Sequence, residues 1–545
     1  MNLTSFYLAN ESLLSNAGIG VLYALSMTVL MRAGVFSLAH CGLGAVGAYT
    51  SALLILHAHL PWPLAAAAGA AAAALVGLLL AATVARLRHV YLTIATVAFA
   101  EVIRLALVNF GFTGGPVGLG PIPRTVQAPT VWITALAACW VIARLARTRF
   151  GVSAESLGAD EPAARAQGVD VAATRIRLFA LSGALAGTAG ALGALHDYHI
   201  DPGNYTLQQT LAVVMCAVVG GTRRVTGTVL GTVAITLIPQ GLIDLGVGAG
   251  WISVALQGAI LVLVVLFLPQ GLGGLLPRRA PAPVAEPLPA APARPVALDI
   301  EDVSLSFGGV KALTGVTLHA APGEVLGLIG PNGAGKTTLI NVITGQYRPD
   351  RGSVHLGGQE ITGEPVHRIA RRGIGRTFQN LRVFADQTCR DNVTAGAVTT
   401  LPATAWHRIL ALPKGRRVDR DLAARAAGLL GRAGLPGRDT ALAGALAYGD
   451  QRRLEMARAA AASPGLLILD EPAAGMNESE ALQLADTIRE HAAQGHTVLV
   501  VEHNMAMIRR ACDRVLVLAS GAPLAEGTPD EVVNDPRVIE AYLGA

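Results

Sequence analysis

The chain has 545 residues, of which 52% are hydrophobic and only 14% are charged. An average soluble domain is about 25% charged, so we exclude a single water-soluble enzyme, a disordered chain and a collagen-like chain. The formal net charge is +5, but no basic stripe is interleaved with aromatic residues, so we predict no nucleic-acid partner. The cysteines lack metal-ligand spacing, which predicts buried small side chains. They are Cys41, Cys139, Cys216, Cys389 and Cys512.

The shortage of charge belongs to the first half of the chain. No lysine precedes Lys311, and charges reach ordinary density only after Pro295. Between the halves lies Pro277–Ala297, which is rich in Pro and Ala and lacks apolar periodicity. Such a composition is typical of an extended, semi-rigid tether. We therefore predict a polytopic, all-helical membrane domain at 1–276, a linker at 277–297 and a separate α/β domain at 298–545.

Apolar stretches of the first half approach the 20 or so residues that a membrane-spanning helix needs. We predict nine spans: 12–31, 33–56, 63–85, 90–109, 129–146, 174–195, 206–221, 225–242 and 247–268. Arginines gather in alternate gaps, whereas the other gaps contain only Arg124. The arginines are Arg32, Arg86, Arg88, Arg147, Arg149, Arg165, Arg223, Arg224, Arg278 and Arg279. Because arginine favours the cytoplasmic side, the N-terminus is predicted outside and everything after Pro277 inside.

A glycine-rich loop follows a short buried-strand pattern at Val325–Ile329 in the second half. The loop is Gly330-Pro331-Asn332-Gly333-Ala334-Gly335-Lys336-Thr337-Thr338, and a helix pattern follows it. This arrangement fits G-x-x-x-x-G-K-[ST], in which backbone N–H groups and a helix N-terminus bind phosphates. Lys336 is expected to contact the β- and γ-phosphates, and the Thr337 hydroxyl to face Mg²⁺.

Two further apolar strands end in polar residues that suit phosphate chemistry. Leu466–Leu469 leads into Asp470 and Glu471, and Thr497–Val501 leads into Glu502 and His503. We expect Asp470 to serve Mg²⁺, directly or through water, and Glu471 to act as the general base on the attacking water. His503 is a candidate contact of the γ-phosphate.

Together these motifs resemble the ATP-binding-cassette (ABC) family over the whole second half. The resemblance implies that Gln379 senses the γ-phosphate and belongs to the metal site, that His503 is the switch histidine and that Phe307 stacks on adenine. Residues 474–477 lie where the family has its D-loop. The stretch Leu446-Ala447-Tyr448-Gly449-Asp450-Gln451-Arg452-Arg453 resembles the signature, usually LSGGQ. ATP and Mg²⁺ are the implied cofactors.

The signature departs from the family pattern at two positions. Ala447 replaces a serine and Asp450 replaces a glutamine. Backbone N–H groups near Gly449 still suit an anion, and we interpret Asp450 as a possible cap of the following helix. The signature acts in trans on a partner's ATP, so the resemblance implies that these departures concern the partner's site.

The loop at 155–175 predicts a short helix around Glu161–Val169. It resembles the coupling-helix loop of bacterial ABC importers. This resemblance implies that Glu161, Ala164 and Gly168 belong to the coupling loop; an ordinary amphipathic loop helix is the alternative.

The first half also resembles the permease of the branched-chain (hydrophobic) amino acid uptake family. Three stretches carry this resemblance: 33–49, 91–119 and 218–231. The chain therefore looks like two fused subunits that are usually separate.

This resemblance implies a transporter of the bacterial inner membrane with a cytoplasmic ATPase. It implies a second permease and a second ATPase, non-identical to this chain, and an extracytoplasmic substrate-binding protein; a homodimer is the alternative. Branched-chain or other small amino acids are the expected cargo. Urea or an amide, export of a lipid or drug, and a non-transporting ATPase regulator remain alternative functions.

Overall fold

The computed structural model describes residues 3–84, 87, 89–222, 224–244, 250–276, 287–288, 293–401, 405–410 and 412–543. The chain divides into two compact units, one of residues 1–158 and 172–279, the other of 159–171 and 280–545. Most of the predicted linker lies outside the described residues. Five of the arginines from which the membrane topology is predicted also lie outside them: Arg86, Arg88, Arg223, Arg278 and Arg279.

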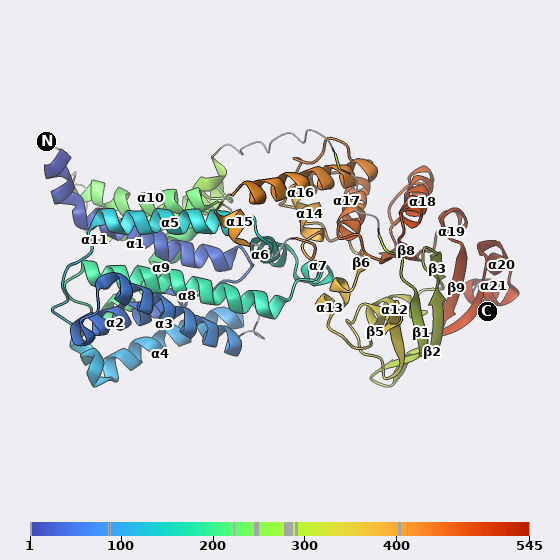
Figure 1. Cartoon of the computed structure of the whole chain (residues 1–545), viewed down its shortest axis with the longest axis horizontal. Helices are drawn as coiled ribbons and strands as arrows, with labels where there is room; N and C mark the ends of the chain where they lie inside the picture. The colour runs from blue at the N-terminus through green and yellow to red at the C-terminus, as the bar shows by residue number, and fades with distance from the viewer. Residues whose placement is uncertain are drawn as a thin grey trace. The chain divides into compact units, whose positions relative to one another are not determined.

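The first unit is built of helices, most of them long and apolar (Figure 1). They are α1 (Leu3–Met31), α2 (His40–Ala58), α3 (Trp62–Val84), α4 (His89–Asn109), α5 (Ala128–Leu145), α6 (Arg149–Ala159), α8 (Val171–His196), α9 (Leu207–Gly220), α10 (Val225–Asp244) and α11 (Gly250–Phe267). Six segments among the described residues have the length and composition of a membrane span: Asn10–Met31, His40–Ala58, Trp62–Val84, Val90–Asn109, Ala128–Leu145 and Val171–His196. The all-helical membrane class is thus confirmed.

The nine predicted spans are only partly matched. The last three correspond to apolar helices whose fully described parts are shorter, at Leu207–Gly220, Val225–Ile238 and Ala255–Phe267. Their crossing of the membrane stays a prediction. The second span does not start at residue 33 as predicted. Gly34 has φ +70° and the chain stays non-helical until His40, because a left-handed residue cannot continue a right-handed helix.

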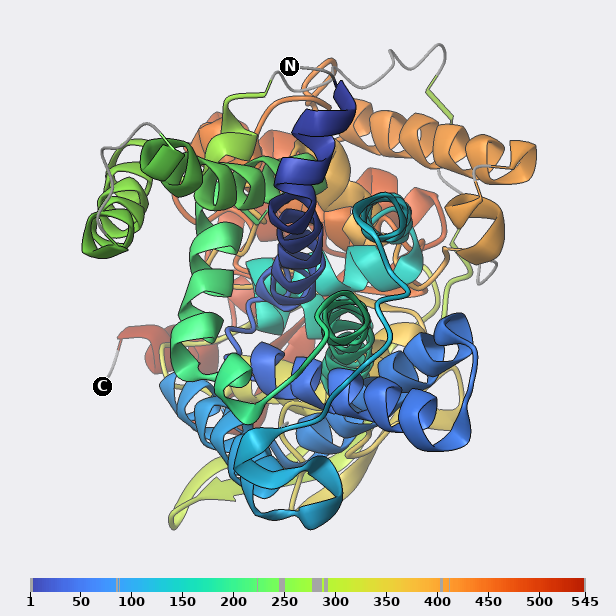
Figure 2. The same cartoon turned by 90° about the vertical axis from the view of Figure 1, so that its left-hand side faces the viewer.

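Small residues allow the central helices of this unit to touch backbone to backbone. A Cβ on Gly47 of α2 would lie 2.3 Å from the Gly187 carbonyl of α8, and one on Gly190 would lie 2.0 Å from the Gly44 carbonyl. The small residues at 42–47 and 183–193 therefore serve close helix packing. Figure 2 shows α1 and α8 near the middle of the bundle. Of the apolar 18-residue stretches of these two helices, 78% and 72% are buried, against 17% for the stretch in α4.

The second unit contains two sheets. The strands are β1 (Leu298–Phe307), β2 (Val310–Ala320), β3 (Val325–Ile329), β4 (Arg351–Leu356), β5 (Gln359–Glu360), β6 (Ile374–Arg376), β7 (Leu466–Asp470), β8 (Thr497–Val501), β9 (Arg514–Ala519) and β10 (Ala522–Gly527). An antiparallel sheet has the order β2-β1-β4-β5, and a six-stranded sheet has the order β10-β9-β3-β8-β7-β6. Within the second sheet the pairings of β9, β3, β8, β7 and β6 are parallel.

Helices cover the parallel sheet and form a separate bundle beside it. They are α7 (Glu161–Ala166), α12 (Lys336–Ile343), α13 (Val366–Arg371), α14 (Cys389–Gly396), α15 (Ala405–Ile409), α16 (Pro413–Arg432), α17 (Tyr448–Ala460), α18 (Glu478–Ala493), α19 (Met505–Ala511), α20 (Pro529–Val533) and α21 (Pro536–Leu543). Every residue of β3, β7 and β8 is buried, as a sheet covered on both faces requires. All three strands were predicted from their apolar runs. The five cysteines are free and buried, also as predicted.

Candidate functional site

The phosphate-binding motif forms a loop between β3 and α12. Gly330, Gly333 and Gly335 have φ of +150°, +82° and +96°, a region in which a side chain is strained. A Cβ on Gly330 would lie 2.2 Å from the Leu518 carbonyl, and one on Gly335 would lie 2.7 Å from the Ala312 carbonyl. A Cβ on Gly333 would meet nothing within 4 Å. The loop is therefore packed tightly on its inner side and open on the other, as a phosphate cradle must be.

Lys336 is the first residue of α12 and turns back over the loop. Its Nζ donates to the carbonyls of Gly330 at 2.6 Å and Pro331 at 3.0 Å. Burial lowers the pKa of Lys336, while the carboxylates of Glu471 and Asp470 act in the opposite direction. The ammonium group thus lies at the loop, within the electrostatic reach of both carboxylates.

Asp470 and Glu471 follow one another at the carboxyl end of β7, which lies between β8 and β6. Burial raises the pKa of Asp470, although the nearby Arg376 guanidinium favours its charged form; Arg376 Nη2 is 3.6 Å from Asp470 Oδ2. The other oxygen, Oδ1, is buried without a hydrogen-bond partner among the described residues. Glu471 has φ +48°, a strained conformation for a glutamate.

Gln379 joins this cluster from a different part of the chain. Its Nε2 donates to Glu471 Oε2 at 3.3 Å. The hydroxyl of the exposed Thr337, the side-chain carbonyl of Gln379 and the unpartnered oxygen of Asp470 are all oxygen donors, the kind of ligand that Mg²⁺ prefers. The residues therefore fit the metal that the motif implies.

His503 lies beyond the carboxyl end of β8, and its side chain is 68% exposed. The preceding residue, Glu502, is almost fully buried and accepts three backbone hydrogen bonds. The donors are the N–H groups of Ala473 at 2.7 Å, His503 at 3.0 Å and Asn504 at 3.4 Å. Glu502 thereby connects the histidine loop to the segment after Glu471. In the sequence, this role of Glu502 is indicated only by the position of its carboxylate directly after an apolar strand.

Phe307 is the last residue of β1, and it is 45% exposed. Its ring meets the Tyr347 ring edge to face, with centroids 5.1 Å apart. An exposed aromatic pair suits stacking on a base. Tyr347, the second ring of this pair, was not predicted from the sequence.

The signature residues lie at the start of α17. Ala447 occupies the N-cap position without a side-chain cap bond, and the helix begins at Tyr448. The interpretation of Asp450 as the cap is therefore wrong, because Asp450 lies inside the first turn. Its Oδ1 is instead 3.6 Å from Arg453 Nη1 on the same helix.

The predicted loop helix forms as α7, and it belongs to the second unit, where it packs beside α13 (Figure 1). Asp160 caps it, with Oδ1 accepting from the Ala163 N–H at 2.7 Å. Ala164 is fully buried, and Glu161 pairs with Arg165 on the following turn. Beyond the helix, Gly168 has φ +81° and its carbonyl accepts from Arg371 Nε of α13 at 2.9 Å.

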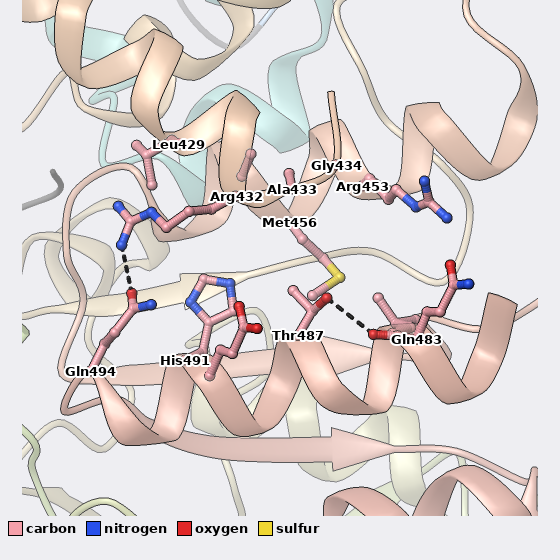
Figure 3. A pocket seen from close by; sticks show the side chains of 13 residues that line it. Leu429, Arg432, Ala433, Gly434, Arg453, Met456, Gln483, Thr487, His491 and Gln494 are labelled. Atoms are coloured by element: carbon pink, nitrogen blue, oxygen red, sulfur yellow. Dashed lines mark hydrogen bonds between the residues drawn. The ribbon is translucent and has the colours of Figure 1, made fainter. Parts of the chain in front are cut away.

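A separate hollow of about 140 Å³ lies between α16, α17 and α18 (Figure 3). Its described lining includes no residue of the phosphate loop, the Asp-Glu pair or the histidine loop. Arg432 Nη1 donates to Gln494 Oε1 there at 2.8 Å. The hollow is therefore distinct from the nucleotide site.

Comparisons with known proteins divide the chain in the same way. Residues 10–265 match the permease component of the branched-chain amino acid transport system. Residues 313–474 match the ABC transporter model, and residues 522–545 match the branched-chain amino acid ATP-binding cassette transporter model.

Curated relatives match the second half. The high-affinity branched-chain amino acid transport ATP-binding protein BraF of Pseudomonas aeruginosa is 42% identical over 252 residues, covering 46% of this chain and 98% of BraF. LivG of Escherichia coli K12, with the same description, is 42% identical over 45% of this chain and 97% of LivG. LptB, the lipopolysaccharide export system ATP-binding protein of Acidithiobacillus ferridurans, is 38% identical over 42% of this chain and 89% of LptB.

The cassette alone is thus similar both to branched-chain amino acid transport proteins and to a component of a lipopolysaccharide export system. The permease match and the C-terminal match point to one family, that of branched-chain amino acid transport. The chain belongs to the branched-chain amino acid ABC transporters, and it joins the permease and the ATP-hydrolysing component of such a transporter in one polypeptide.

Proposed function

We propose that this chain imports branched-chain or related small amino acids across the bacterial inner membrane at the expense of ATP. The observation that carries the proposal is the permease match at residues 10–265, in the same chain as a cassette 42% identical to BraF and LivG. BraF and LivG are named for high-affinity branched-chain amino acid transport.

The ATP site is proposed to work through residues that the fold brings to one edge of the parallel sheet. The loop at 330–338 binds the phosphates, with Lys336 neutralising the β- and γ-phosphate charge. Phe307 stacks on adenine. Glu471 is the general base, because its carboxylate follows the buried β7 strand and projects beyond the sheet edge beside Gln379. His503, which is exposed on the neighbouring loop, contacts the γ-phosphate.

Mg²⁺ is proposed to be held by Thr337, Gln379 and Asp470. When bound, it neutralises the charge that develops on the phosphates during transfer. The orphaned Oδ1 of Asp470 supports this assignment, since a buried carboxylate oxygen without a partner is costly unless a ligand or water satisfies it.

The signature residues Ala447, Tyr448, Gly449 and Asp450 are proposed to complete the ATP site of a partner cassette. A single cassette supplies only one half of each such site, so a second ATPase and a second permease are needed. We propose that these are non-identical subunits, and that an extracytoplasmic binding protein delivers the substrate. Membrane lipid surrounds the apolar helices, whose outer faces expose residues such as Leu79 and Phe267.

The domain boundaries are proposed at 1–276, 277–297 and 298–545, with the ATPase in the cytoplasm. The loop containing Glu161, Ala164 and Gly168 is proposed to transmit cassette closure to the membrane helices. Its fit beside α13 supports this role, because a docked helix transmits a displacement that a free loop does not.

The test is uptake of labelled leucine by proteoliposomes that contain the chain, its partner subunits and the binding protein. ATP-dependent leucine uptake that excess valine inhibits and urea does not is the expected result. Binding of urea but not leucine by the binding protein would favour the urea alternative. ATP-dependent efflux without a binding protein would show an exporter instead.

A further inference from the structure

Helix α4 carries two charged residues in a segment with the length and composition of a membrane span. This segment, Val90–Asn109, has 20 residues, so at about 1.5 Å per residue it is roughly as long as the hydrocarbon core is thick. Glu101 lies eleven residues after Val90 and eight before Asn109, and Arg104 follows it by one helical turn. Glu101 therefore lies near the middle of the span, whereas the other charged residues of the six described spans lie within seven residues of an end.

The two side chains form an ion pair on the outside of the helix. Arg104 Nε donates to Glu101 Oε2 at 2.9 Å and to Oε1 at 3.1 Å, and Nη2 also donates to Oε1. The Glu101 side chain is 47% exposed and the Arg104 side chain is 27% exposed. A guanidinium has five N–H donors, so the two on Nη1 are not used by this pair.

The inner face of α4 packs against α2 and the residues before it. Thr96 is fully buried, and its Oγ1 accepts a hydrogen bond from the Leu38 N–H at 3.0 Å. A Cβ on Gly42 of α2 would lie 2.9 Å from Ala100 Cα of α4. Exposed residues recur every three or four positions along α4, which places them together on the opposite face. These residues, the outer stripe of α4, are Tyr91, Ile94, Ala98, Glu101 and Leu105.

Membrane lipid does not suit the outer stripe. Ionisable residues at the centre of a membrane span almost always face the interior of a helix bundle or a water-filled cavity, and they mark substrate or ion pathways. The Glu101–Arg104 pair is exposed at the surface of this permease, so the cavity that such a pair requires must have another protein as its second wall. The second permease proposed above supplies that wall.

The outer stripe also has the chemistry that recognises an aliphatic amino acid. The Glu101 carboxylate is complementary to an ammonium group, and the N–H groups of Arg104 are complementary to a carboxylate. Ile94 and Leu105 flank the pair along the helix and are 60% and 46% exposed, so they offer apolar surface to a branched side chain. Ala98, one turn before Glu101, carries only a methyl group and leaves room beside the pair.

We propose that the outer stripe of α4 lines the substrate path between this permease and the second permease, and that Glu101 and Arg104 bind the ammonium and carboxylate groups of the amino acid in transit. This inference rests on the proposed import of amino acids. The substrate exchanges part of its hydration for contacts with the ion pair, while its aliphatic side chain lies against Ile94 and Leu105. Its two charges thereby cross the middle of the membrane with partners of opposite sign.

The first measurement asks whether water and substrate reach the outer stripe. Ala98→Cys is made in the complete reconstituted transporter, in which the five cysteines of this chain are buried, and is treated with a charged thiol reagent of the methanethiosulfonate class. Because the thiolate is the reactive form, labelling is expected only where water reaches the cysteine. Leucine at about ten times its half-saturating concentration for uptake is expected to slow labelling about tenfold, by occupying the path.

Leu79→Cys on α3 is the matched control, because Leu79 is 56% exposed on an uncharged span that lipid covers. This cysteine is expected to stay unlabelled. An unlabelled Ala98→Cys, or labelling that leucine does not slow, would overturn the proposal. If Ala98→Cys does not assemble, Val102→Cys replaces it, since Val102 is 62% exposed and adjoins Glu101.

The second measurement separates a substrate contact from a structural ion pair. Glu101→Gln is expected to lower leucine uptake per ATP hydrolysed about tenfold or more, because a hydrogen bond to a charged group is lost. Exchange of the charges, by Glu101→Arg together with Arg104→Glu, keeps an ion pair and should keep the thermal midpoint near that of the wild type. Uptake should stay low in this variant, because each charge then meets the wrong end of the substrate.

Uptake restored by the exchanged pair would show a structural ion pair and overturn the proposal. Wild-type uptake after Glu101→Leu with Arg104→Leu would show a pair that serves neither water nor substrate, and would overturn it as well. A wild-type transporter without leucine uptake would instead refute the proposed function, so the two failures are distinguishable.

Discussion

Gly168→Ala tests the seating of the loop helix on α13. Gly168 has φ +81°, and a residue with a Cβ pays roughly 1–2 kcal/mol for this conformation. The new Cβ would lie 2.5 Å from Thr399 Cγ2 and 3.1 Å from Arg371 Cγ. Overpacking of this kind costs about 1–3 kcal/mol. The sum of about 2–5 kcal/mol lowers the equilibrium constant for docking of the loop helix by a factor of roughly 30 or more, at 1.36 kcal/mol for each factor of ten.

The assay is leucine uptake per ATP hydrolysed by the reconstituted transporter. Gly168→Ala is expected to lower this ratio, and adding Thr399→Ser, which removes Cγ2, is expected to recover the steric part but not the backbone part. Gly431→Ala is the control, because a Cβ there meets nothing within 4 Å and the residue lies inside α16. Full coupling in Gly168→Ala, or no gain from Thr399→Ser, would refute the reasoning.

Two further predictions concern the signature and the membrane helices. Asp450→Gln removes a negative charge from the start of α17 and should lower KM for ATP in the partner's site. The ion pair of Asp450 with Arg453 is partly exposed, so the free energy of unfolding should change by less than about 1 kcal/mol. An unchanged KM would show that the carboxylate does not act on the nucleotide. Gly190→Ala forces a Cβ to 2.0 Å from the Gly44 carbonyl and should lower the thermal midpoint of the purified chain, whereas Gly193→Ala, with its nearest neighbour at 4.0 Å, should not. Equal midpoints would contradict the close helix packing.

The strands and the phosphate loop could be predicted because their signals are contiguous. Four consecutive apolar residues, Leu466–Leu469, followed by Asp470 and Glu471, define both a buried strand and the side chains at its end. The parallel sheet then brings the ends of β3, β7 and β8 together, so residues far apart in sequence meet at one edge.

Other features depend on packing that one segment does not encode. Arg452 and Glu455 lie in a helix whose composition is that of a solvated face, and only the tertiary structure buries them. The start of α2 depends on the backbone at Gly34, and the cap of α17 depends on where its first turn closes. The lengths of the last apolar helices could not be predicted from the sequence, because hydrophobicity in that part of the chain does not mark where a helix ends.

ATP hydrolysis at this chain's own site is proposed to drive transport through its own permease. Glu471→Gln keeps the size of the side chain and removes the base beside Gln379, while Lys336 and the phosphate loop remain. The measurement is ATP binding and leucine uptake by the same reconstituted preparation. The expected result is retained ATP binding with uptake abolished, and full leucine uptake by Glu471→Gln would contradict the account.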